Sequence, residues 1–126
     1  MRTAALLLTL ALPIAANADI VDIKWVDGTF THKASIASKK FLEVCGKQKK
    51  GDVVAWQFKG GAPTDFNIHY HVGKEVSYPE NRKEVASAEG SLPVALDQDY
   101  CWMWSNKTAQ VAEIELQLTQ VRQMAK

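Results

Sequence analysis

Two histidines, His69 and His71, are separated by one residue in a stretch where apolar and polar side chains alternate, Asp65 to Val72. Residues two apart on a β-strand project from the same face, so both imidazoles would point to one side with Asp65 and Asn67 in line. Imidazole nitrogens bind copper, zinc and nickel. Because the sequence does not place a third ligand, a polar outer face without metal is the other interpretation.

Two further residues are candidates to complete such a copper or zinc site. His32 is the only other histidine, and Met103 lies between Trp102 and Trp104. A methionine shielded by aromatic rings resembles soft copper(I) sites, although such a residue more often fills space in a core. A blue-copper site is not favoured, because no histidine follows Cys101.

The first residues have the parts of a secretory signal peptide. Arg2 precedes an apolar run that ends in the small-residue sequence Ala16-Asn17-Ala18. We therefore predict a signal peptide at residues 1–18 and one domain at residues 19–126. No later apolar run reaches the roughly 20 residues of a membrane span, so we expect no transmembrane anchor and a periplasmic or secreted protein.

Cys45 and Cys101 are the only cysteines, and an exported chain favours a disulfide between them. A Cys-x-x-Cys motif is absent, which argues against catalytic thiol chemistry. Asn106-Lys107-Thr108 is a glycosylation sequon. We expect it to be unused, because the signal peptide looks bacterial.

Composition and motifs exclude several classes of function. Without Arg2 the chain carries 14 basic and 14 acidic residues, which argues against a nucleic-acid partner. The motifs of serine hydrolases, zinc proteases and phosphate-binding loops are absent, and the carboxylates are scattered. The sequence therefore predicts a protein that is not an enzyme.

Turn signals recur at roughly ten-residue spacing, and no segment shows a sustained helical period. This pattern is typical of an antiparallel β-sandwich of about seven or eight strands, with a barrel as the alternative. The expected core consists of the large residues on alternating faces, Trp56, Phe58, Phe66, Ile68, Tyr100, Trp102 and Trp104.

Three local signals predict where strands end. Gly46 to Gly51 should be a lysine-rich loop, Lys59 to Pro63 should break the chain between two strands, and Pro79 to Asn81 should form a turn. The stretch from Arg82 to Gly90 could be an edge strand or a loop.

The alternation also bears on the disulfide. If Tyr100, Trp102 and Trp104 face the core, Cys101 and Met103 face outward. Cys45 also faces outward if its neighbours on the strand are buried, which favours a disulfide on the outer surface. The alternative is a disulfide between the sheets, beside Trp102.

Several segments together resemble the GOLD (Golgi dynamics) domain: Lys50 to Phe58, Asp65 to Ile68, Tyr78-Pro79, Gly90-Ser91 and Tyr100 to Asn106. The resemblance covers about residues 41–118 and implies a β-sandwich that acts as a protein-interaction or cargo-binding unit. Membrane-bound members continue into a coiled coil and a transmembrane helix, whereas this sequence resembles a secreted, stand-alone form. Those members also place their second cysteine at the position of Met103 here, two residues after Cys101.

The sequence thus predicts an exported, non-enzymatic binding module for an unidentified protein or envelope component. The alternative is a periplasmic copper- or zinc-binding protein that uses His69 and His71, with His32 or Met103.

Overall fold

The computed structural model describes residues 19–121, so the predicted signal peptide lies outside the described residues. This part of the chain forms strands without helices, as the sequence predicts. The strands are β1 (Asp19–Asp22), β2 (Thr29–Ile36), β3 (Phe41–Gln48), β4 (Val53–Val72), β5 (Glu75–Pro93), β6 (Gln98–Ser105) and β7 (Ala112–Val121). Within residues 19–121, no helix is long and apolar enough to cross a membrane.

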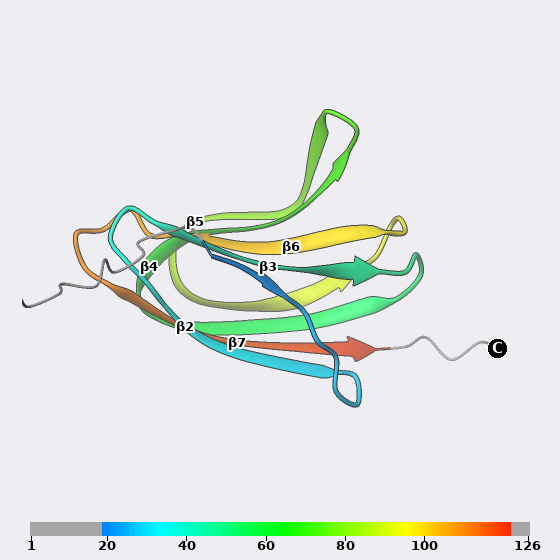
Figure 1. Cartoon of the computed structure of the whole chain (residues 1–126), viewed down its shortest axis with the longest axis horizontal. Coiled ribbons are helices and arrows are strands. Elements are labelled where there is room, and N and C mark those ends of the chain that lie inside the picture. The colour runs from blue at the N-terminus through cyan, green and yellow to red at the C-terminus, as the bar shows by residue number, and fades with distance from the viewer. Residues whose placement is uncertain (1–18, 122–126) are drawn as a thin grey trace, which may run out of the picture.

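One curled sheet contains all seven strands, in the order β1-β3-β6-β4-β7-β2, with β5 paired to β4 (Figure 1). The fold class is the predicted all-β sandwich type. One pairing departs from the antiparallel rule, because β1 runs parallel to β3.

The curl arises from β4, which belongs to two layers. Val53 to Gly60 pairs with β7, whereas Asp65 to His69 pairs with β6. We call β1, β3, β6 and the second half of β4 the β6 layer, and β2, β7 and the first half of β4 the β7 layer. β5 follows β4 through both layers.

The predicted break at Lys59 to Pro63 is therefore wrong, because β4 continues through it as one strand. The register with β5 shifts between Lys59 and Thr64, and glycines at such bulges let a strand bend without losing its partner. On β5, Glu84 turns the chain with a φ of 50°, and its N–H donates to Asp65 Oδ1 at 3.0 Å.

The predicted turn at Pro79 to Asn81 is also wrong, because β5 runs through it. Pro79 lies where the register slips between Ile68 and Tyr70, and the lack of an N–H is tolerated at a bulge on an edge strand. The lysine-rich loop begins later than expected, since β3 extends to Gln48. Residues 82–90, for which the sequence allows an edge strand or a loop, form a strand.

Aromatic side chains from both layers fill the space between them. Phe58 of the β7 layer contacts Trp104 of the β6 layer edge-on, with ring centroids 5.5 Å apart, and Phe66 packs on Trp56 at 5.0 Å. All seven predicted core residues are at most 2% exposed: Trp56, Phe58, Phe66, Ile68, Tyr100, Trp102 and Trp104. The outward residues of β6 are consequently fixed on the surface of the β6 layer.

Candidate functional site

Both cysteines lie on the outer face of the β6 layer and form a disulfide. Cys45 on β3 is directly opposite Cys101 on β6, which in turn is opposite His69 on β4. The three residues thus form one row across three neighbouring strands. The disulfide is on the outer face and not between the layers, because Val44 and Trp102, on the opposite face, are completely buried.

His69 is buried in this row, with only 5% of its surface exposed. Its Nδ1 lies 2.7 Å from Asn67 Oδ1, and its Nε2 lies 3.2 Å from Glu43 Oε1. Burial lowers the pKa of His69 below its ordinary value, the Glu43 carboxylate opposes this, and the neighbouring His71 adds to it. Oxygen atoms thus lie beside both ring nitrogens and fix the orientation of the imidazole.

The structure places the predicted metal-binding residues in two different regions. His71 has its ring 5.3 Å from that of His69, and Met103 lies beside Asn67 on the same outer face. His32 does not join them. It lies on β2 opposite Leu116, with its ring stacked on Phe30.

Glu43 is the residue that sequence reasoning missed. Its carboxylate, the His69 nitrogen and the Cys101 sulfur lie within 4.8 Å of one another. Alternation along β3 does place Glu43 on the same face as Cys45. The missing information was that β6 lies between β3 and β4, which brings that face next to His69.

Beyond His69, β4 and β5 leave the rest of the sheet and form a two-stranded arm, residues 70–78 (Figure 1). Pairing with β6 ends at His69, so the backbone of the arm pairs only within its own ladder, while the Tyr70 ring at its base packs on Tyr100 of β6 at 4.8 Å. A two-residue turn at Gly73-Lys74 closes it, with Gly73 at a φ of 60°. The arm exposes three large apolar side chains, Val72, Val76 and Tyr78.

One face of the arm continues the surface that carries His69. Val76 is directly opposite His71, and the Tyr78 ring is 5.9 Å from the ring of His69. Tyr78 is 54% exposed, although it stands beside a buried histidine. An aromatic ring, an aliphatic side chain and an imidazole thus form one accessible strip along the arm.

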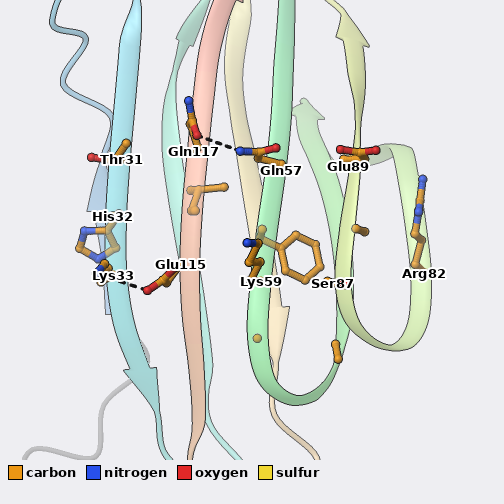
Figure 2. Close-up of a pocket in the computed structure, with 15 residues that line it drawn as sticks. Thr31, His32, Lys33, Gln57, Lys59, Arg82, Ser87, Glu89, Glu115 and Gln117 are labelled. Carbon is orange, nitrogen blue, oxygen red and sulfur yellow. Dashed lines mark hydrogen bonds and ion pairs between the residues drawn. The ribbon is translucent and has the colours of Figure 1, made fainter.

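A shallow groove of about 1080 Å³ lies over the outer face of the β7 layer (Figure 2). Its side chains largely satisfy each other: Gln57 donates to Gln117 at 2.8 Å, and Lys33 pairs with Glu115 at 3.3 Å. Within residues 19–121, no hydrogen bond joins the groove's Ser87 to a histidine or carboxylate.

The asparagine of the Asn106 sequon is buried and hydrogen-bonded. Asn106 is 1% exposed, and its Nδ2 donates to the carbonyls of Ile36 and Gln110. Its Oδ1 accepts from the N–H and hydroxyl of Thr108. The side chain fixes the turn after β6, and a glycan cannot be accommodated on it in the folded chain.

No protein-family model matches this sequence, and no curated protein matches it. Solved structures do share the fold. Aeromonas hydrophila PliG, a periplasmic lysozyme inhibitor of g-type lysozyme, has a TM-score of 0.64 and 11% identity, over 83% of this chain and 98% of that one.

Two other structures have a similar fold. The pre-peptidase C-terminal domain of a Bacillus anthracis collagenase has a TM-score of 0.60 and 10% identity, over 82% of this chain and 95% of that one. The Yersinia pseudotuberculosis-derived mitogen has a TM-score of 0.58 and 12% identity, over 80% and 91%. At these identities the likeness establishes the fold alone.

Proposed function

We propose that this protein is an exported, non-enzymatic binding module, and that the arm at residues 70–78 contacts a protein partner in the cell envelope. The observation that carries the proposal is the exposure of Tyr78 and Val76 on a ribbon that projects from the sandwich (Figure 1). Exposed aromatic and aliphatic side chains that lie together are typical of interface centres, where tyrosine is enriched.

The shape of the arm suggests what kind of partner it fits. A two-stranded ribbon is narrow and convex, so it complements a concave surface, and ligand and active sites of enzymes are concave. Several proteins of this fold are named as periplasmic inhibitors of g-type lysozyme, from Aeromonas hydrophila, Salmonella Typhimurium and Escherichia coli. An envelope enzyme with a cleft is therefore the partner class that we propose.

Two further features support an exported module without catalysis. The Cys45–Cys101 disulfide is typical of an oxidising compartment. In the groove over the β7 layer, polar side chains pair with one another, Gln57 with Gln117 and Lys33 with Glu115. The resemblance to the GOLD domain, an interaction unit, stays a prediction that agrees with this function.

The test measures binding of the mature chain to g-type lysozyme and inhibition of that enzyme. We expect a complex that weakens about 30-fold or more in a Val76→Ser/Tyr78→Ser variant, since hot-spot residues contribute roughly 2 kcal/mol or more. Val111→Ser is the control, because Val111 is at least as exposed as the two arm residues but lies outside the arm. Both variants should melt at the wild-type temperature.

If lysozyme does not bind, cross-linking in intact envelopes extends the test to other proteins. Recovery of the same partner by wild type and the Val111→Ser variant, but not by the arm variant, would support the proposal. A partner that binds the arm variant as tightly as wild type would contradict the role of the arm. The absence of any arm-dependent partner in both experiments would overturn the proposed function.

A further inference from the structure

Four side chains with affinity for metals gather on the outer face of the β6 layer. Cys45, Cys101 and His69 form the row across β3, β6 and β4, and Glu43 precedes Cys45 by two residues on the same face. They come from the consecutive strands β3 and β4 and from β6, which lies between them in the sheet. The eight residue pairs between β3 and β6 hold the two cysteines in register.

The spacing of their ligand atoms suits a zinc ion. His69 Nε2 and Glu43 Oε1 are 3.2 Å apart. Ligand atoms at about 2.0–2.1 Å from a tetrahedral zinc lie roughly 3.3 Å from each other. The Cys101 sulfur lies within 4.8 Å of both atoms, and Cys45 adds a second sulfur beside it.

We propose that reduction of the Cys45–Cys101 disulfide converts this face into a zinc site with Cys45, Cys101, His69 and Glu43 as ligands. In the oxidised protein the sulfurs are bonded to each other and cannot act as thiolates, which are the form that binds metal. The ligand set that results from reduction, two thiolates, one imidazole and one carboxylate, consists of the groups that zinc prefers.

The proposed reductant is a dithiol. One of its thiolates attacks a sulfur of the disulfide, and its second thiol resolves the mixed disulfide, so the reductant becomes a disulfide. Two electrons and two protons thereby pass to Cys45 and Cys101. Zinc then displaces both thiol protons, which leave to solvent.

The surroundings favour a closed site. The side chains of His69 and Glu43 are only 7% and 18% exposed, and Asn67 contacts the other ring nitrogen of His69. A hydrogen-bond partner on that nitrogen fixes the ring orientation of a metal-bound histidine. None of the four ligands belongs to residues 70–78, although the Tyr78 ring of the arm lies 5.9 Å from the His69 ring.

The experiment titrates zinc into the mature chain with and without a non-thiol phosphine reductant. We expect one zinc per reduced chain and none in the oxidised chain. Cobalt(II) in place of zinc should give thiolate charge-transfer absorption, which reports sulfur ligands directly. His69→Gln should weaken zinc binding more than tenfold, because losing a ligand costs more than losing a hydrogen-bond partner of a ligand, which already costs about 10- to 100-fold. His32→Gln, the matched control, should leave it unchanged.

A Cys45→Ser variant tests the site without reductant, because it cannot form the disulfide but keeps Cys101, His69 and Glu43. It should bind one cobalt ion with a weaker thiolate band. If reduction unfolds the wild-type chain, zinc should restore the fold and raise the melting temperature. Equal zinc binding in both redox states, full affinity in His69→Gln, or a reduced chain that zinc neither binds nor refolds would each overturn the proposal.

Discussion

Replacing Cys45 and Cys101 with alanine is expected to lower the melting temperature by about 16 °C. The disulfide joins residues 56 positions apart, and the chain-entropy relation gives about 4 kcal/mol for closing a loop of that length. In a domain of this size, 1 kcal/mol corresponds to roughly 4 °C. Because both side chains are partly exposed on the outer face, their truncation leaves no buried cavity to add to this loss.

Calorimetry or circular dichroism with a metal chelator present measures the effect. Wild type in reductant serves as the internal control and should melt with the alanine variant, since both lack the cross-link. A decrease of less than about 5 °C in both samples would refute the reasoning. Such a result would mean that part of the eight-pair β3–β6 ladder persists in the unfolded chain, or that the bond strains the folded state.

Two further substitutions test the packing of Gly90 on Trp56 and the ion pair between Asp65 and Lys107. Gly90→Ala should destabilise the fold by about 1–3 kcal/mol, because the new Cβ would lie 2.6 Å from the buried Trp56 ring. Gly61→Ala is the control, since its Cβ would meet only ordinary van der Waals contacts. Urea unfolding should give a lower midpoint for Gly90→Ala than for Gly61→Ala, and equal midpoints would contradict the packing argument. The Lys107 ammonium lowers the pKa of Asp65 below its ordinary 3.8 in the folded chain. The unfolded chain therefore binds the proton at a higher pH than the folded chain does. The ion pair stabilises the fold above pH 3.8, and this stabilisation is lost as the pH falls through the folded pKa. Asp65→Asn should therefore lose less stability on acidification than wild type, and identical acid curves would reject this assignment.

The faces of the strands could be predicted from sequence because side chains alternate on any extended strand, whatever its partners. This alternation placed Trp102 and Trp104 in the core and Cys101 outside it, as the structure has them. The predicted faces also placed His69 and His71 together. These inferences needed only local geometry.

The connections between strands could not be predicted in the same way. Gly60, Gly61 and Pro63 carry the residue types of a chain break, and Pro79 carries that of a turn, yet both stretches lie in continuous strands. Glycine and proline occur at bulges and edges as well as at turns. Long-range pairing with β6 and β7 determines whether a bulge or a turn forms at these residues, and the local sequence does not indicate this pairing.

The path of β4 places the proposed zinc site and the proposed partner-binding arm next to each other. His69 is the last β4 residue paired with β6, so it ends the proposed zinc site at the point where the arm begins. The Tyr78 ring lies 5.9 Å from the His69 ring, so a Tyr78 substitution disturbs both sites, whereas Val76 lies opposite His71 within the arm. Val76→Ser alone should therefore weaken partner binding without changing zinc affinity in the reduced chain. His69→Gln should do the reverse, and a variant pair that failed to separate the two readouts would show that arm and zinc site are one functional unit.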